Sequence, residues 1–98
     1  MAEDDTDATV LVTGAGRRLG RAIALDLAAR GWRVGVHYHA SAAAAAGLVD
    51  EIEAMGGQAA ALQADLARLD DLAPLIEACS QALGTPTCLI NNLSLIHI

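Results

Sequence analysis

The sequence is poor in aromatic residues and has no lysine. It contains one tryptophan, one tyrosine and no phenylalanine, although 54% of its 98 residues are hydrophobic. Alanine, leucine, valine and isoleucine must therefore build the core. All six basic residues are arginines, so no reaction that needs a lysine amine can take it from this chain.

Other features are also missing. Cys79 and Cys88 have neither C-x-x-C nor another metal-ligand spacing, which predicts buried thiols rather than a disulfide or a metal site. No apolar run reaches the roughly 18 residues of a spanning helix, and no leader of a basic segment followed by an apolar one is present. We therefore expect a cytoplasmic protein without a membrane partner.

The charge is negative, −6 overall. Four of the twelve acids lie among the first seven residues, and the other eight acids against six arginines leave −2. This balance argues against nucleic acid as a partner, which would select a basic surface. Residues 1–7 are interpreted as an acidic disordered arm.

Short β-type runs alternate with helical stretches along the rest of the chain. The predicted strands are Thr9–Thr13, Arg33–His39, Gln58–Gln63 and Thr87–Asn91. The predicted helices are Arg18–Arg30, Ser41–Met55 and a third that starts at Asp70 or Asp71 and ends near Leu83. The order βαβαβαβ predicts an α/β fold, the N-terminal part of a doubly wound (Rossmann) parallel sheet with strand order 3-2-1-4.

Helix patterns add local expectations. Leu19, Ile23 and Leu27 recur at i, i+4 and predict the inward face of the first helix. Ser41 is a good N-cap for the second helix, as is Asp70 or Asp71 for the third. Each helix is followed by glycine, at Gly31, Gly56-Gly57 and Gly84.

A glycine turn joins the first strand to the first helix, with glycines at 14, 16 and 20. The dinucleotide pattern G-x-G-x-x-G fails because position 19 is leucine, and a P-loop fails because no Gly-Lys-Ser/Thr follows. The turn still predicts a phosphate cradle, since glycines admit a pyrophosphate and the helix start donates N–H groups. The alternative is a plain strand–turn–helix whose glycines serve turn geometry alone.

The second strand bears on cofactor type. An NAD site places an Asp or Glu about 20 residues past the turn to bind the ribose 2′-hydroxyl. Residues 36–41 read Val-His-Tyr-His-Ala-Ser and hold no carboxylate. His39 and Ser41 can donate hydrogen bonds there, and Arg17 and Arg18 lie in the turn. These donors favour NADP(H) over NAD(H).

The segments Thr-Gly-Ala-Gly-Arg-Arg-Leu-Gly at 13–20 and His-Tyr-His-Ala-Ser at 37–41 resemble the short-chain dehydrogenase/reductase family, with Arg18 where most members carry a glycine. Together they resemble its pteridine-reductase-like branch. The resemblance covers residues 8–92 and implies an NADP-binding Rossmann half-domain. The segments specify a cofactor fold more strongly than a pteridine substrate.

The resemblance also implies residue roles. Arg18 and Leu19 would contact the diphosphate region; Tyr38, His39 and Ser41 the adenosine phosphate end; Asp65 and Leu66 the adenine; and Asn92 would support the sheet and cofactor. The predicted cofactor-binding residues are Gly14, Arg17, Arg18, Leu19, Gly20, Tyr38, His39, Ser41, Asp65, Leu66 and Asn92, with no metal ligand.

Several of these residues have simpler interpretations. His37 and His39 share one side of a strand and could form half a metal site, but no third ligand is evident. Tyr38 could be a half-buried aromatic at a strand end, and Asp65 a loop or cap residue. Asn91 and Asn92 could be ordinary turn residues.

Catalysis in the resembled family uses a serine, a tyrosine and a lysine four residues after the tyrosine. This chain has no lysine, and its one tyrosine is Tyr38. We therefore expect no catalytic residue here: these 98 residues alone are expected to be inactive, and the full-length parent to be an NADP-dependent, homo-oligomeric reductase of small carbonyl or pteridine-like substrates. Residues 93–98 match the translation of a transposon mosaic end, which predicts an adapter-derived tail on a truncated gene.

Two other functions remain open from the sequence. One is a non-catalytic dinucleotide-binding or redox-sensing module, which a parent without Tyr-x-x-x-Lys would favour. The other is a different enzyme on the same cofactor fold, such as a nucleotide-sugar epimerase, against which Arg18 and the segment 37–41 argue. Fold alone does not separate them.

Overall fold

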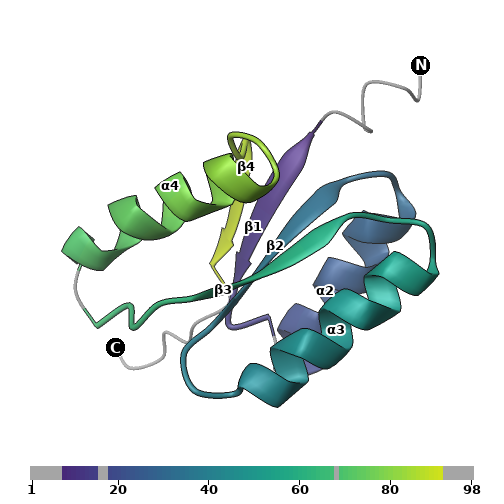
Figure 1. The fold of residues 1–98 in the computed structure, drawn as a ribbon, viewed down its shortest axis with the longest axis horizontal. Coiled ribbons are helices and arrows are strands. Elements are labelled where there is room, and N and C mark those ends of the chain that lie inside the picture. Colours follow the sequence, from purple (N-terminus) through teal and green to yellow (C-terminus); the bar gives the residue numbers. More distant parts are fainter. Residues whose placement is uncertain (1–7, 16–17, 68, 92–98) are drawn as a thin grey trace.

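A computed structural model describes residues 8–15, 18–67 and 69–91. The elements run in the order β1 (Thr9–Thr13), α2 (Arg18–Ala29), β2 (Arg33–Tyr38), α3 (Ala42–Ala54), β3 (Ala59–Gln63), the single turn η1 (Leu69–Asp71), α4 (Leu72–Ala82) and β4 (Cys88–Asn91) (Figure 1). This is the predicted βαβαβαβ alternation, and each strand starts or ends within one residue of its predicted limits. No helix in this described part is long and apolar enough to cross a membrane.

All four strands are parallel and lie in the predicted order β3-β2-β1-β4. The chain moves outward from β1 through β2 to β3 and then returns to the other side of β1 to form β4. Right-handed crossovers put α2 and α3 on one face of the sheet and α4 on the other (Figure 1). The direction of strand order therefore reverses between β1 and β4.

Two apolar clusters form the core. On the face covered by α2 and α3, the cluster contains Val10, Val12, Ala15, Ala24, Ala28, Val34, Val36, Ala45, Leu48 and Ile52. On the α4 face it is smaller and contains Leu11, Leu62, Leu75 and Cys79. β1 is buried along its whole length because both of its faces are covered. Leu89 of β4 pairs in register with Leu11 but is 44% exposed, so α4 leaves this end of its face open.

The predicted inward face of α2 is confirmed only at Leu27, which packs against the α2/α3-face cluster. Leu19 is 64% exposed, and Ile23 and Leu27 are only half-buried. The side chains that α2 buries are those of Gly20, Ala24 and Ala28. Small residues let the helix lie close to the sheet, and the larger apolar side chains flank that line of contact.

The predicted helix caps were right in position and wrong in chemistry. Ser41 and Asp71 occupy the N-cap positions of α3 and α4, but neither side chain makes a capping hydrogen bond. The glycine stops are confirmed: Gly31, Gly56 and Gly84 have φ values of 99°, 90° and 120°. These are left-handed conformations that glycine adopts most readily.

Gly35 in β2 lies beneath the α4 face of the sheet, within contact distance of Cys79. A Cβ atom there would be 3.0 Å from Cys79 Sγ and 3.1 Å from Leu11 Cδ1. We expect Gly35→Val to lower the free energy of unfolding by about 1–3 kcal/mol through overpacking, measured by urea denaturation. Gly47→Val is the control, because nothing lies within 4 Å of a Cβ at Gly47. Equal stability of the two variants would contradict this packing argument.

Candidate functional site

The candidate site lies at the carboxyl edge of the sheet, where all four parallel strands end together. In folds of this kind, ligands bind outside the carboxyl ends of the strands at the point where the strand order reverses. Here that point lies between β1 and β4. The predicted site residues that the structure describes come from the turn after β1, the start of α2 and the ends of β2 and β3.

The turn after β1 is built for close approach by a ligand. Gly14 has φ 61°, a left-handed conformation, and Ala15 is buried beneath the turn. The Ala15 N–H donates to the His37 carbonyl at 3.1 Å. α2 starts at Arg18, so its free backbone N–H groups and positive dipole end face this edge. This is the chemistry of an anion-binding cradle.

The residues at the start of α2 divide by burial. Arg18 and Leu19 are exposed, and Gly20 is buried. Arg18 and Leu19 are thus accessible to a ligand at the cradle, whereas Gly20 brings the helix start close to the sheet. Arg17, also predicted for this site, lies outside the described residues.

His37 links two parts of the site, a role that sequence reasoning missed. Its buried ring lies between the Gly14 N–H, 3.0 Å from Nδ1, and the Ala64 carbonyl, 2.8 Å from Nε2. A backbone N–H can only donate and a carbonyl only accept, so Nδ1 is the acceptor and Nε2 carries the proton. Burial lowers the pKa of His37 below its ordinary 6.5; the bond to Ala64 opposes this and His39 adds to it.

The ends of β2 and β3 bring two predicted residues together. His39 Nε2 lies 3.6 Å from Asp65 Oδ2, and both side chains are largely exposed. The Gln63 amide donates to the His39 carbonyl at 3.1 Å, which fixes the backbone beside the pair. Ser41 is exposed two residues later. Exposed polar side chains therefore surround the end of β2.

Two other predicted site residues are partly buried against the core. Tyr38 is half-buried and packs against the α2/α3-face cluster, and Leu66 is half-buried and packs against the α4-face cluster. At the end of β1, the Thr13 hydroxyl lies 3.1 Å from Asn91 Oδ1, which ties β1 to β4 at the switch point. Asn92 lies outside the described residues.

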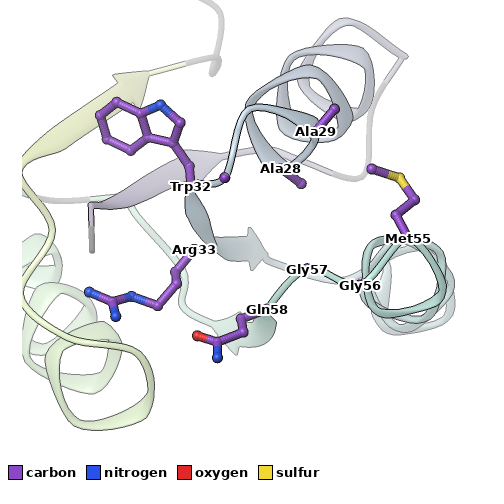
Figure 2. A pocket seen from close by; sticks show the side chains of 9 residues that line it. Ala28, Ala29, Trp32, Arg33, Met55, Gly56, Gly57 and Gln58 are labelled. Carbon is purple, nitrogen blue, oxygen red and sulfur yellow. The ribbon is translucent and has the colours of Figure 1, made fainter. Parts of the chain in front are cut away.

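A separate cavity of about 270 Å³ lies at the opposite edge, where α2 and α3 end (Figure 2). Trp32, Arg33 and Met55 are among its lining residues, with Gly57 and Gln58 before β3. The helix carboxyl ends that border this cavity carry partial negative charge, whereas the glycine turn lies at the positive end of α2. Among the residues that the structure describes, no three His, Cys, Asp or Glu side chains gather as a metal site requires.

Comparison with known proteins agrees with this geometry. The sequence model of the family described as short chain dehydrogenase matches residues 8–97. The chain belongs to the short-chain dehydrogenase family. The matched residues include the glycine turn and all four strands. The residues that show the family are therefore also those that form the candidate site.

Curated relatives within the short-chain dehydrogenase family include several reductases. The chain is 40% identical over 84 residues to the 3-oxoacyl-(acyl-carrier-protein) reductase FabG of Staphylococcus epidermidis, covering 86% of this chain and 34% of that protein. It is 41% identical over 85 residues to the short-chain dehydrogenase/reductase homolog YusS of Bacillus subtilis, covering 87% and 78%. The chain thus spans about a third of the length of the first relative and most of the second.

Solved structures extend the likeness. FolM alternative dihydrofolate reductase 1 of Brucella suis, crystallised in complex with NADP, has a TM-score of 0.87 at 36% identity over 95% of this chain and 37% of its own. The promiscuous reductase LugOII, which catalyses a keto-reduction in lugdunomycin biosynthesis, has a TM-score of 0.81 at 36% identity over 93% and 40%. At 36% identity, these two proteins are similar to this chain in sequence as well as in fold.

Proposed function

We propose that this chain is the NADP(H)-binding part of a short-chain reductase, with the cofactor at the carboxyl edge of the sheet. One observation carries the proposal: the left-handed Gly14 turn and the start of α2 lie beside a strand end that offers His39 and Ser41 and no carboxylate of its own. Solved neighbours that hold NADP support it.

The donor set fits the charge of the cofactor. The diphosphate would lie against the Gly14 turn and the first residues of α2. There Leu19 is accessible, Gly20 lets the helix start lie close to the sheet, and Arg17 and Arg18 would supply positive charge. His39 and Ser41 would bind the 2′-phosphate, with Tyr38 behind them. Asp65 lies beside His39, with 3.6 Å between Asp65 Oδ2 and His39 Nε2.

The remaining predicted residues would complete the adenosine end. Asp65 and Leu66, after β3, would flank the adenine, and Asn92, after β4, would support the cofactor near the switch point. When bound, NADPH supplies a hydride. The residues of this chain would bind and orient it, while the tyrosine and lysine of the family mechanism would have to come from elsewhere, because this chain has no lysine.

We further propose that the substrate of the complete reductase is a carbonyl compound or a pteridine. The FolM neighbours, named as dihydrofolate reductases, favour a pteridine, and the segment 37–41 agrees with that branch. LugOII and the 3-oxoacyl reductases favour a ketone. We place the pteridine-type substrate first because the two sequence segments that resemble this branch both lie in the proposed site.

A second candidate function is a stand-alone dinucleotide-binding module without catalysis. One observation favours it: the aligned 85 residues make up 78% of YusS, a family relative little longer than this chain. The coding sequence that follows this segment in the source genome separates the two proposals. A Tyr-x-x-x-Lys motif there supports the reductase, and its absence supports the module.

Cofactor choice tests the first proposal. We expect the double variant Arg18→Gly, Ser41→Asp to weaken NADP⁺ binding about ten- to a hundredfold more than NAD⁺ binding. Ser41→Asp places a carboxylate at the 2′-phosphate, whereas Arg18→Gly removes a cation from the diphosphate region that both cofactors share. Isothermal titration calorimetry measures both affinities.

The matched control for this test is Arg30→Gln, Gln58→Glu, which makes the same change in charge away from the carboxyl edge. Arg30 is exposed beside Asp26, and Gln58 lines the cavity at the opposite edge. The control should leave both affinities within about twofold. Equal losses of NADP⁺ and NAD⁺ binding in the site variant would remove the case for a 2′-phosphate site.

A further inference from the structure

The His37 ring connects two segments that are far apart in the sequence and adjacent in the proposed site. It accepts the Gly14 N–H and donates to the Ala64 carbonyl. The same residue also accepts the Ala15 N–H through its own carbonyl at 3.1 Å. Three hydrogen bonds at one residue of β2 therefore set the position of the glycine turn relative to β2 and the loop that follows β3.

This arrangement requires an uncharged ring. Protonation at Nδ1 would point an N–H at the Gly14 N–H, replacing a hydrogen bond by a repulsion between two donors. Because the ring is 2% exposed, water cannot satisfy either nitrogen instead. Losing the bond would release the Gly14 turn, whose left-handed backbone presents the cradle.

The described charges near His37 are few. His39, directly after the end of β2, lowers the pKa of His37, and Asp65, on the loop after β3, lies beside His39. β1 has no titratable side chain, and on α4 the Cys79 thiol, on the same face of the sheet, is kept neutral because burial raises its pKa. Burial, rather than a partner charge, keeps His37 neutral.

We propose that the uncharged His37 imidazole is a positioning residue that holds the glycine turn and the loop after β3 at the spacing the dinucleotide needs. The inference rests on the proposed function, since it concerns the affinity of the same site. His37 acts through Gly14 and Ala64, at the part of the cofactor common to NADP⁺ and NAD⁺. It therefore affects both dinucleotides alike, whereas His39 affects only NADP⁺.

The sign of the pH effect follows from the neutral ring. The folded state holds His37 with a pKa below the ordinary 6.5, so its contribution to stability is complete above pH 6.5 and is lost as pH falls toward the lowered value. The affinity for the dinucleotide falls as pH falls, as the stability does, because protonation of His37 would release the glycine turn. NAD⁺ is the probe for this profile, since it lacks the 2′-phosphate, which itself titrates near pH 6.

The test compares the unchanged 98-residue chain with His37→Ala, His37→Gln and the control His39→Gln. Calorimetric titrations with NADP⁺ and NAD⁺ are run from pH 8 to pH 5, with circular dichroism of each variant as a check on folding. The glutamine amide offers an acceptor oxygen and a donor nitrogen, as the two ring nitrogens of the neutral imidazole do, but it does not titrate.

At pH 8 we expect His37→Ala to lower the affinity for both dinucleotides about tenfold. His37→Gln should restore both affinities to within about threefold of those of the unchanged chain. NAD⁺ affinity of the unchanged chain should fall several-fold by pH 5, and that of His37→Gln should stay flat. His39→Gln should lower the affinity for NADP⁺ and leave the affinity for NAD⁺ unchanged. If His37→Ala does not fold, the rescue and the flat profile of His37→Gln decide.

Three outcomes overturn the inference. One is unchanged NAD⁺ affinity in a folded His37→Ala variant, and another is a His37→Gln profile that keeps the pH dependence of the unchanged chain. The third comes from ¹H–¹⁵N correlation of the histidine rings: a proton on Nδ1 of His37 at pH 8 excludes the geometry. If the unchanged chain binds neither dinucleotide, the proposed function fails first and the inference fails with it.

Discussion

Gly14→Val is expected to lower the affinity for NADP⁺ by about a hundredfold. Gly14 has φ 61°, and a non-glycine residue held there carries about 1–3 kcal/mol of strain, more when it is β-branched. The turn must either carry that strain or change shape, and the valine side chain would also occupy space beside the diphosphate. About 3 kcal/mol corresponds to roughly a hundredfold in affinity.

Gly56→Val is the matched control for this prediction. Gly56 has φ 90° and follows α3 at the opposite edge of the sheet, and nothing lies within 4 Å of a Cβ there. It should show a similar loss of folding free energy with little change in NADP⁺ affinity. Calorimetry and urea denaturation of both variants separate the two effects. A Gly14→Val variant that binds NADP⁺ as the unchanged chain does would place the cradle elsewhere.

The 98 residues are expected to show no reductase turnover. General acid catalysis contributes about 10²–10⁴-fold to rate, and the family resemblance assigns it to a tyrosine aided by a lysine. This chain has no lysine, and its one tyrosine, Tyr38, is half-buried against the α2/α3-face cluster at the end of β2. The group that would protonate a carbonyl oxygen is missing from these residues.

NADPH oxidation in the presence of a 3-oxoacyl thioester or a dihydropteridine measures this directly by absorbance. The 3-oxoacyl-(acyl-carrier-protein) reductase FabG of Staphylococcus epidermidis, the relative described above, serves as the positive control for the thioester. Oxidation of NADPH at a rate proportional to the concentration of the chain would refute the prediction.

The sequence predicted the sheet well because its signals there are local and strong. The five residues of β1 are β-branched or apolar and are all buried. Glycines after each helix fix where the chain turns, and the alternation of strand and helix leaves one topology once right-handed crossovers are assumed. The position of Arg18, Leu19, His39 and Asp65 at one edge follows from that topology alone.

The inward face of α2 could not be predicted in the same way. Periodicity weights large apolar side chains, and Leu19, Ile23 and Leu27 have helical spacing as regular as that of Gly20, Ala24 and Ala28. The choice between the two stripes depends on how closely the helix approaches the sheet, which is a tertiary property. The structure buries the stripe of small residues, which lets α2 lie close to the sheet.

The role of His37 was also beyond local reasoning. Its partners, Gly14 and Ala64, are 23 and 27 residues away, so no spacing rule connects them. The sequence did carry one usable signal. His37 lies two residues after Gly35 and so shares its face of the strand, and a polar side chain buried there needs hydrogen-bond partners. The absent side-chain cap at Ser41 similarly depends on the backbone, with φ −93° and ψ 65°.

The most direct test of the central claim is a map of amide chemical shifts on adding NADP⁺ to the ¹⁵N-labelled chain. Binding at the carboxyl edge predicts the largest shifts at Gly14, Ala15, His39 and Asp65, with smaller shifts at His39 when NAD⁺ replaces NADP⁺. Shifts concentrated instead at Trp32, Gly57 and Gln58, around the cavity at the opposite edge, would contradict the proposed cofactor site.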